Sequence, residues 1–448
     1  MESSTVGDER AIQRLPQSLQ TLMAFERFHL CKPNEFYKPS GDSSFDARYL
    51  PQNCSAFALP CFWVPRERLY IYSCPIECSD GLDMYVGKDS NDRVLFPIHP
   101  LALHYYESFL SAVHARNAAL DGLVTMAVPT SSVRTLLAWP EHAPADALFV
   151  KVTMMPSPMF GDRRLYAKKV GFSVGITKLV QESHAILPAA LSYLPESVGF
   201  VPRKKLDSGV ILRSIPREIR EGHIVVAPLF SLVGGTGAYK PLFLTIISRS
   251  GMLPLQFVED VLCSKFSILW LRMSMCFGLL PEVHSQNLLL GLSPSLAPIG
   301  RFFYRDFDGL LVDWALRRAN SLHEPADMPC SSSWYETYGT LFAGSEYCEL
   351  VWWKMKVSLY AYLHSVLDDL NNYLLEWQTQ GLLAGPTIRS GDLTMMFSRH
   401  MIKNIEVLFG ITGEPAYNIH GSLNKFLIFL MKIRREIIAG KVRCITGT

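Results

Sequence analysis

Short apolar runs separated by turn-forming residues fill the chain between Tyr70 and about Gly251. They are rich in β-branched or aromatic residues and are bounded by Pro, Gly or Asp: LYIYS, RVLFPI, GLVTMAV, LFVKVTM, GVILRSI, HIVVAPLF and PLFLTII. Runs of this kind are typical of β-strands. We therefore expect at least one sheet in this region, with helices at residues 101 to 119 and around 180 to 194.

After Met252 the apolar positions recur with the period of an α-helix. One helical face holds Leu255, Val258, Leu262, Phe266 and Leu269, and a second holds Val351, Met355, Tyr362, Val366, Leu370 and Tyr373. Spacings of three, four and seven residues place side chains on one side of a helix. The C-terminal part is therefore predicted to be mostly helical, apart from a strand-like insert near residues 281 to 313, and the fold class is predicted to be α+β.

Length and composition limit the possible classes of protein. A chain of 448 residues with 49% hydrophobic residues can bury a large core, and its length favours two or three domains. Lys and Arg total 43 against 41 Asp and Glu, so no overall basic field indicates a nucleic-acid partner. The first residues lack an apolar signal-peptide core, and Arg272 interrupts the apolar stretch that begins at Phe266. We expect a cytoplasmic protein with no membrane partner.

Cysteines are scattered along the chain. Cys54, Cys61, Cys74 and Cys78 lack the paired spacing of a structural zinc site, and reduced core thiols are expected at Cys263, Cys276 and Cys348. Residues 32 to 56 are rich in Pro, Ser, Asp and Asn, which predicts a long loop after a short N-terminal helix.

Two polar clusters border apolar runs in the strand-like insert, PEVHSQNLLLGL at 281 to 292 and FYRDFDGLLVD at 303 to 313. Asn287 and Asp306 carry the oxygen ligands that Mg²⁺ prefers, and His284 and Arg305 could neutralise phosphate oxygens. The alternative is purely structural: His284 and Asn287 would cap a turn, and Arg305 would pair with Asp308 at the surface.

Polar residues that suit phosphate also occur upstream. In AVPTSSVRTL, Ser132 and Arg134 lie two residues apart on a predicted strand and would face the same way. Taken alone, a Ser-x-Arg sequence more often marks the solvent-exposed edge of a strand than a phosphate site. Lys151, inside LFVKVTM, needs a buried partner or a ligand. Arg163 follows in FGDRRLY, and His99 and Pro100 precede them in FPIHP.

Taken in order, these segments resemble the IucA/IucC family of NRPS-independent siderophore synthetases. The resemblance covers residues 90 to 315 by motif: HP (His99, Pro100), S-x-R-T (Ser132 to Thr135), Lys151 with Arg163 twelve residues later, E-x-H-x-Q-N (Glu282 to Asn287) and RD-x-x-G (Arg305 to Gly309). Three departures accompany it. Leu101 and Ala102 replace the usual Trp and Gln after HP, Ser285 replaces a Gly, and the family's N-terminal His-rich motif is not found before Phe96.

The resemblance implies a thumb, fingers and palm architecture that uses ATP and Mg²⁺ to adenylate a carboxylic acid, commonly citrate, and passes the acyl group to an amine or alcohol. It implies a reduced thumb-like region at 1 to 90, fingers at 91 to 251 and a palm at 252 to 448, with a homodimer as a possible assembly. Triphosphate binding would fall to Ser132, Arg134, Thr135, Lys151, Arg163, His284 and Gln286. Mg²⁺ would be held by Glu282, Asn287 and Asp306, and catalytic roles would fall to Lys151, His284 and Arg305.

Two other readings of the sequence stay open. His284, Asn287 and the DFDG at 306 to 309 are also typical of small-molecule or protein kinases, but no Asp precedes Asn287 to act as the hydroxyl base. A catalytically degenerate synthetase that serves as a binding scaffold is the other alternative.

Overall fold

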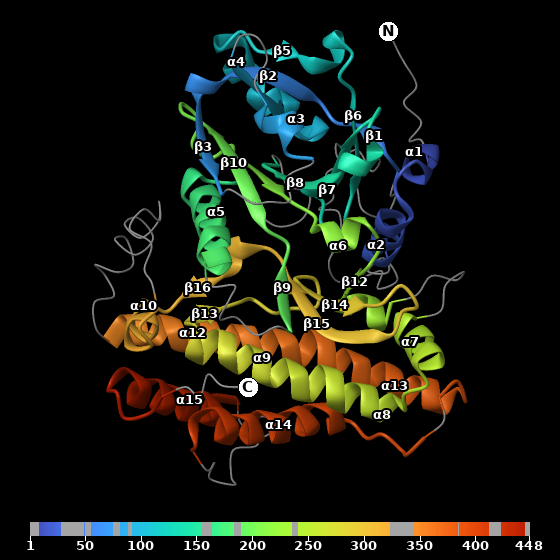
Figure 1. The fold of residues 1–448 in the computed structure, drawn as a ribbon, viewed down its shortest axis with the longest axis vertical. Coiled ribbons are helices and arrows are strands. Elements are labelled where there is room, and N and C mark those ends of the chain that lie inside the picture. The colour runs from blue at the N-terminus through green and yellow to red at the C-terminus, as the bar shows by residue number, and fades with distance from the viewer. Residues whose placement is uncertain are drawn as a thin grey trace, which may run out of the picture. The chain divides into compact units, whose positions relative to one another are not determined.

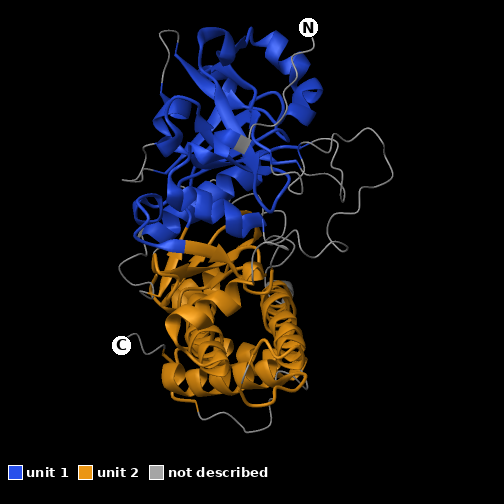
Figure 2. Ribbon diagram, turned by 90° about the vertical axis from the view of Figure 1, so that its right-hand side faces the viewer, with its two compact units in different colours: residues 1–181, 194–225 blue, residues 182–193, 226–448 orange. Residues whose placement is uncertain are grey.

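The chain is described here by a computed structural model, which covers residues 9–27, 49, 55–74, 81–87, 92–154, 164–182, 190–234, 241–322, 345–383, 385–411 and 423–443. It divides into two compact units, drawn in blue and orange in Figure 2. Unit 1 comprises Met1–Gln181 and Leu194–Val225, and unit 2 comprises Glu182–Tyr193 and Val226–Thr448. The predicted α+β class is confirmed, whereas the division into three regions at residues 90 and 251 stays a prediction.

Unit 1 is built on a seven-stranded sheet in which all neighbouring strands run antiparallel. Its strands, in spatial order, are β1 (Phe57–Ala58), β6 (Thr125–Pro129), β7 (Thr135–Pro140), β8 (Leu148–Val152), β11 (Val210–Arg213), β10 (Glu196–Pro202) and β3 (Leu69–Ser73). A smaller sheet has the order β4 (Arg93–Pro97), β2 (Cys61–Pro65), β5 (Arg116–Asn117). Three of its six strand pairs, β6–β7, β7–β8 and β10–β11, join strands that are close in sequence, and the other three join distant segments.

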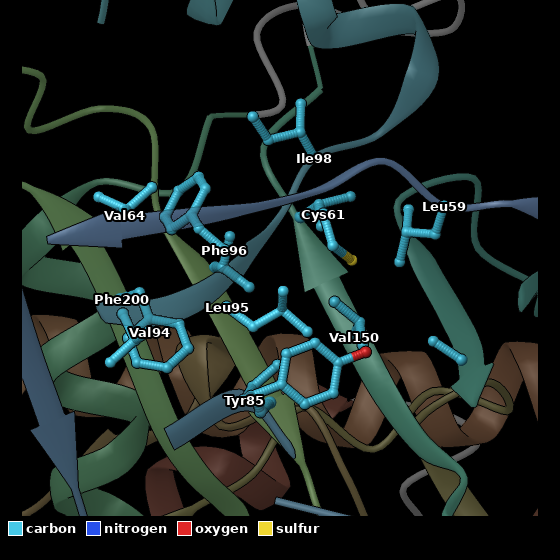
Figure 3. Packing of buried hydrophobic residues seen from close by; sticks show 14 of the residues in the cluster. Leu59, Cys61, Val64, Tyr85, Val94, Leu95, Phe96, Ile98, Val150 and Phe200 are labelled. Atoms are coloured by element: carbon cyan, nitrogen blue, oxygen red, sulfur yellow. The ribbon is translucent and has the colours of Figure 1, made fainter. Parts of the chain in front are cut away.

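Apolar side chains cover one face of the large sheet. Val150 on β8 and Phe200 on β10 join a cluster with Val94, Phe96 and Tyr85, which come from the small sheet and from α3 (Asp83–Val86) (Figure 3). Tyr106 and Phe109 of α4 (Leu103–Ala112) belong to the same cluster. Side chains alternate between the two faces of a strand, so neighbouring β8 residues point to the other face.

The opposite face packs against α5 (Ala167–Glu182). Val170 of this helix lies in a cluster with Leu165, Val201 and Ile211, and a side chain at Gly199 would collide with Val170. The absence of a Cβ at Gly199 therefore lets the helix approach the sheet closely. The remaining short elements of the unit are α1 (Glu9–Gln13), α2 (Gln17–Arg27), η3 (Arg66–Arg68), η4 (Pro100–Ala102), η5 (Ala118–Asp121), η6 (Pro144–Asp146) and α6 (Arg217–Arg220).

Unit 2 combines two small sheets with long helices. The first sheet has the order β12 (Val225–Pro228), β14 (Leu288–Leu292), β15 (Pro298–Tyr304), β9 (Leu191–Tyr193), and the second pairs β13 (Leu279–Leu280) with β16 (Leu311–Val312). Short helical elements flank them: η7 (Leu229–Leu232), α7 (Leu242–Ser250), η10 (Phe307–Gly309) and α10 (Trp314–Ala319). The strand-like insert predicted inside a helical region is therefore confirmed.

Two long helical rods lie beside these sheets (Figure 1). The first runs from Pro254 to Cys276 through α8 (Pro254–Phe257), η8 (Val258–Lys265), α9 (Phe266–Leu271) and η9 (Arg272–Cys276). The second runs from Ser345 to Thr379 through α12 (Ser345–Tyr362), η11 (Leu363–Asp368) and α13 (Asp369–Thr379). The segments η8, η9 and η11 are π-helical. Helix α14 (Asp392–Phe409) packs on the first rod and α15 (Leu423–Ile438) on α12, so the C-terminal part is mostly helical, as predicted.

Three local predictions are wrong. PLFLTII forms helix α7, because Leu242, Phe243 and Ile246 bury one helical face and Gly251 ends the helix in the left-handed conformation. The helix expected around 180 to 194 lies earlier, in α5, and Leu191–Tyr193 form strand β9. The helix expected at 101 to 119 ends at Ala112 and is followed by β5.

Among the cysteines that the structure describes, Cys61, Cys74, Cys263 and Cys348 are reduced thiols, not part of a disulfide. Burial raises the pKa of Cys61 to about 12, so this thiol is protonated and unreactive at neutral pH. Cys276 is disulfide-bonded, so the prediction of a reduced thiol there is wrong. Most of the predicted loop at 32 to 56 lies outside the described residues. No helix within them is both long and apolar enough to cross a membrane.

A buried ion pair joins the last helix of unit 2 to the strand insert. Arg434 on α15 donates from Nε and Nη2 to the Asp313 carboxylate at 2.5 and 2.9 Å, and both side chains are almost completely buried. Asp313 also caps α10 by accepting the Leu316 N–H at 3.1 Å. Removing the carboxylate would leave a buried guanidinium and a helix end without their acceptor.

We expect Asp313→Ala to lower the free energy of unfolding by about 3–5 kcal/mol, the cost of breaking a buried pair from one side. Denaturant unfolding measures this. The matched control is Glu436→Ala, which removes an exposed pair with Lys441 at 3.6 Å and should change stability by less than about 0.5 kcal/mol. Equal losses in the two variants would contradict a structural role of the buried pair.

His99 is a completely buried imidazole at the start of the 3-10 helix η4. Its Nδ1 accepts the Leu101 N–H at 3.2 Å, and Pro100 occupies the first helical position, where no N–H is needed. Within the described residues Nε2 has no hydrogen-bond partner. Burial lowers the pKa of His99 to about 3, so the folded state holds this ring neutral over a range in which the unfolded chain binds a proton.

We expect the stability of the protein to fall as the pH drops from about 6.5, the unfolded pKa of His, towards 3, by up to about 1.4 kcal/mol per pH unit from this ring. His99→Asn keeps an acceptor for the Leu101 N–H but does not titrate, so its unfolding free energy should depend less on pH in that window. Measurements at pH 8, where both rings are neutral, give the reference. Identical slopes for parent and variant would contradict the assignment.

Candidate active site

The two polar motifs meet because β14 pairs with β15. Leu288 lies opposite Tyr304 in this antiparallel ladder, and the Arg305 N–H donates to the Asn287 carbonyl at 3.0 Å. The end of E-x-H-x-Q-N thus lies directly beside the start of RD-x-x-G. Their proximity, which the sequence could only suggest, follows from the register of one strand pair.

Arg305 fixes the loop that precedes β14. Its Nε donates to the Gln286 carbonyl at 3.0 Å, and the residue is 4% exposed. A planar guanidinium with five N–H donors can hold this carbonyl and still present further donors. Arg305 is therefore buried and does not lie at the surface, where the structural alternative expected it. Its predicted catalytic role stays a prediction.

Tyr304 links the two motifs through its hydroxyl. The oxygen accepts the Glu282 N–H at 3.0 Å and donates to the Asp306 carbonyl at 3.4 Å. Asp306 itself has φ +79°, a left-handed conformation that is uncommon outside Gly, and it starts the short helix η10. The backbone is therefore held at Asp306 in a conformation that an unconstrained chain avoids, which is frequent at functional sites.

Glu282 is held by a partner far along the chain. Lys354 of α12 donates from Nζ to Glu282 Oε2 at 3.1 Å. A Cβ added to Gly309 would lie 2.7 Å from the same oxygen, so the carboxylate lies against the backbone of the RD-x-x-G turn. The Gly of this motif is thus explained by the close approach of Glu282.

His284 is neutral at neutral pH. Its pKa is lowered mainly by burial; the carboxylates of Glu282 and Asp306 oppose this shift, and Arg305 and Lys354 reinforce it. Nδ1 accepts the Gln286 N–H at 3.2 Å, so the neutral ring carries its proton on Nε2. Nε2 is then a hydrogen-bond donor, and the phosphate-binding role of His284 stays a prediction.

Ser285, in the middle of the loop before β14, forms backbone hydrogen bonds through both its N–H and its carbonyl. The Ser285 N–H donates to Ser365 Oγ at 2.9 Å, and the Ser285 carbonyl accepts the Phe230 N–H at 3.2 Å. Ser365 belongs to the π-helical segment η11, and such segments occur often at functional sites. The backbone of Ser285, the residue that departs from the family pattern, is therefore fixed within unit 2.

The donor set of Glu282, Asn287 and Asp306 fits Mg²⁺. It offers two carboxylates and one amide, and hard cations of this size take oxygen ligands. The Asn287 Nδ2 donates to the Glu282 carbonyl at 3.4 Å, which directs its Oδ1 away from that carbonyl. Within the described residues no group of three or more His, Cys, Asp or Glu side chains could hold a metal ion. The set assigned here contains two such side chains, Glu282 and Asp306, and the Asn287 amide. The assignment of these three residues to Mg²⁺ stays a prediction.

In unit 1 the predicted strand through Ser132 and Arg134 is wrong, because both residues lie in the turn between β6 and β7. Thr130 Oγ1 organises this turn: it accepts the Ser132 N–H at 3.1 Å and donates to the Thr135 carbonyl at 2.8 Å. The argument that two-residue spacing puts Ser132 and Arg134 on one face therefore fails. A tight turn instead brings several backbone and side-chain donors together.

Thr135 and Lys151 face each other across β7 and β8 and lie on one side of the sheet. Both residues are buried, and Lys151 is only 2% exposed. The Val152 N–H donates to the Arg134 carbonyl at 2.9 Å, which joins the turn to the same strand. Arg163 lies outside the described residues. The phosphate-binding roles of these residues stay predictions.

Sequence reasoning missed Lys354 and Ser365. Lys354 lies between Val351 and Met355 on the buried stripe of α12, with a spacing that a helix places on one face. A lysine at a core position of a helix requires a buried partner, and this pattern could have singled it out. No comparable signal marks Ser365, since serines are common in helices that bond to their own backbone.

No family model and no curated protein matches the sequence. Solved structures do match. The ATP-bound aerobactin synthetase IucA from a hypervirulent pathotype of Klebsiella pneumoniae superposes with a TM-score of 0.59 at 16% identity, covering 89% of this chain and 75% of that chain. The petrobactin biosynthesis protein AsbB from Bacillus anthracis str. Sterne gives 0.60 at 15% identity, covering 87% and 64%.

Aerobactin synthetase IucC from the same Klebsiella pathotype gives a TM-score of 0.59 at 13% identity, covering 96% of this chain and 74% of that chain. This chain thus spans between about two thirds and three quarters of the length of these structures. At such low identities the likeness establishes the fold. The chain has the fold of the IucA/IucC siderophore synthetases, as its ordered motifs predicted.

Proposed function

We propose that this chain is an ATP-dependent ligase of siderophore-type biosynthesis, which adenylates citrate or a related polycarboxylate and condenses it with an amine or an alcohol. The observation that carries the proposal is the hydrogen bond from Arg305 N–H to the Asn287 carbonyl, which joins the two motifs in a chain of this fold. One of the matching structures is an ATP-bound synthetase. That fact supports ATP as the cosubstrate.

The chemistry requires a site that tolerates two anions. A carboxylate oxygen of the acid attacks the α-phosphorus of ATP, the bond from this phosphorus to the bridging oxygen breaks, and pyrophosphate leaves with the bonding electrons. The carboxylate is already ionised at pH 7 and needs no general base. Positive charge and hydrogen-bond donors around the phosphates are therefore the main requirement.

In the second step the amine nitrogen or alcohol oxygen attacks the acyl carbon. The bond from this carbon to the AMP oxygen breaks, AMP leaves, and the nucleophile loses a proton. The product is an amide or an ester, and the two steps together consume one ATP and release AMP and pyrophosphate.

Each set of residues has a task in this proposal. Ser132, Arg134, Thr135, Lys151 and Arg163 take the phosphate-binding roles that the family resemblance implies. His284 donates from Nε2 to a phosphate oxygen, which a neutral ring can do, Gln286 also binds the triphosphate, and Arg305 has a catalytic role. Glu282, Asn287 and Asp306 hold Mg²⁺, which neutralises phosphate charge when it is bound.

A kinase remains the second candidate, because Asn287 and Asp306 also suit metal binding in kinases. The residues before Asn287 argue against it. Kinase chemistry needs a carboxylate that accepts the hydroxyl proton, and residues 283 to 286 supply Val, His, Ser and Gln. The two activities differ in which bond of ATP breaks.

We expect incubation with ATP, Mg²⁺, citrate and hydroxylamine to yield a hydroxamate together with an equal amount of AMP. Hydroxylamine traps an activated acyl group whatever the natural nucleophile is. A panel of polycarboxylates in place of citrate identifies the acid. ADP as the only nucleotide product would establish the kinase, and absence of product with every acid would favour the binding scaffold.

Asp306→Gly removes the proposed metal ligand but allows the same backbone conformation at this position. Gly adopts φ near +79° without strain, so the variant should fold with unchanged or higher stability while losing at least about 100-fold in hydroxamate formation. Asp306→Ala should be equally inactive but about 1 kcal/mol less stable than Asp306→Gly, because Ala resists the left-handed conformation. Urea unfolding and the product assay measure both effects. Retention of Mg²⁺-dependent turnover in Asp306→Gly would remove Asp306 from the metal site.

A further inference from the structure

Lys354 is a buried cation within the candidate metal site. The residue is 7% exposed on the core side of α12, and its Nζ lies 3.1 Å from Glu282 Oε2. It comes from a helix about seventy residues after the loop that it contacts, outside every motif. A lysine this deeply buried needs a fixed partner, since an unpaired ammonium away from water is strongly unfavourable.

The same carboxylate that Lys354 binds is one of the three oxygen donors assigned to Mg²⁺. Gly309 lies against Glu282 Oε2 on another side, so the carboxylate is confined between a cation and the backbone. A divalent ion bound by this oxygen would have to lie close to an ammonium group. The Lys354 side chain is 9% exposed and the Glu282 side chain 35% exposed, so water screens the repulsion between the ion and the ammonium only in part.

Without nucleotide, the remaining oxygen donors would bind a metal ion only weakly. Asp306 and the Asn287 amide contribute one charge between them, and no three His, Cys, Asp or Glu side chains of the described residues form a metal cluster. Mg²⁺ wants six oxygen ligands and is commonly bound through one or two carboxylates plus the phosphates of a nucleotide. The phosphates of ATP would supply further oxygen ligands besides those of Asp306 and Asn287.

We propose that Lys354 withholds Glu282 from divalent cations, so that the metal binds only together with the nucleotide. Lys354 is a positioning residue in this scheme: it acts through Glu282. The proposal rests on the proposed ATP and Mg²⁺ site. It adds that the order of binding is determined by an internal cation, which keeps the negative charge of the free site low until the phosphates arrive.

The test measures Mn²⁺ binding to the full chain by electron paramagnetic resonance, which detects the free ion, without and with a non-hydrolysable ATP analogue. The parent together with the analogue should bind Mn²⁺ at least tenfold more tightly than either the protein alone or the analogue alone. Equal affinity without nucleotide would overturn the proposal, and this measurement needs no variant.

Variants test whether Lys354 is the residue that lowers the Mn²⁺ affinity of the nucleotide-free protein. Lys354→Met should increase the affinity of the nucleotide-free protein for Mn²⁺ about tenfold, whereas Lys354→Arg, which retains the charge, should resemble the parent. Lys356→Met is the matched control: it removes an equal charge two residues away, where the ammonium lies over the Trp352 ring at 5.1 Å, and it should leave Mn²⁺ affinity unchanged. Thermal unfolding of each variant verifies that it is folded.

Adding Glu282→Gln to Lys354→Met should abolish the gain, because the competing oxygen is then neutral. A gain that persists in the double variant, or that Lys356→Met reproduces, would overturn the role of the pair. These binding results do not depend on turnover. If no acid yields a hydroxamate, the ligase proposal fails while nucleotide-dependent Mn²⁺ binding can still stand.

Discussion

The register between β14 and β15 is the constraint on which the polar residues of unit 2 depend. Leu288 opposite Tyr304 puts the Arg305 N–H on the Asn287 carbonyl and the Tyr304 hydroxyl between Glu282 and Asp306. A slip by one residue would turn Tyr304 to the other face of the sheet and break both of its hydrogen bonds. Strand β14 is buried along its whole length, so burial of leucines fixes the geometry of charged residues nearby.

The second helical rod supports this arrangement from outside the sheet. Lys354 and Ser365 lie about three helical turns apart on it and contact one loop at two points, Glu282 and Ser285. The π-helical segment η11 contains Ser365, and its wider turns shift the positions of side chains relative to an unbroken α-helix. Rigid elements of the fold therefore set the position of the loop, as precise chemistry requires.

Local pattern was sufficient for much of the fold. The runs LYIYS, LFVKVTM and GVILRSI form strands β3, β8 and β11, because short β-branched segments between turn residues have few alternatives. PLFLTII was assigned wrongly because a short apolar run fits a strand and one face of a helix equally well. Helix α5 was displaced in the prediction since its sequence, AKKVGFSVGITKLVQE, has only weak amphipathic character.

The candidate site, like the fold, could be predicted only in part from local sequence. The two motifs were recognisable because their residues are close in sequence, yet their contacts depend on partners at long range. Lys354 lies seventy-two residues from Glu282, and local pattern contains no information about such a pair. Ser132 and Arg134 show the opposite failure: the two-residue spacing was read as strand geometry, whereas the Thr130 hydroxyl closes a turn there.

Mutual dependence of buried polar groups explains why a few short motifs indicated the fold at 13 to 16% identity. An apolar core accepts many combinations of side chains of similar volume, so identity there decays without loss of the fold. The motif residues have no such freedom: Gly309 makes room for Glu282, Arg305 holds the Gln286 carbonyl, and His284 accepts the Gln286 N–H. Replacing any one of them leaves a partner unpaired or displaced, at a cost greater than that of most core exchanges.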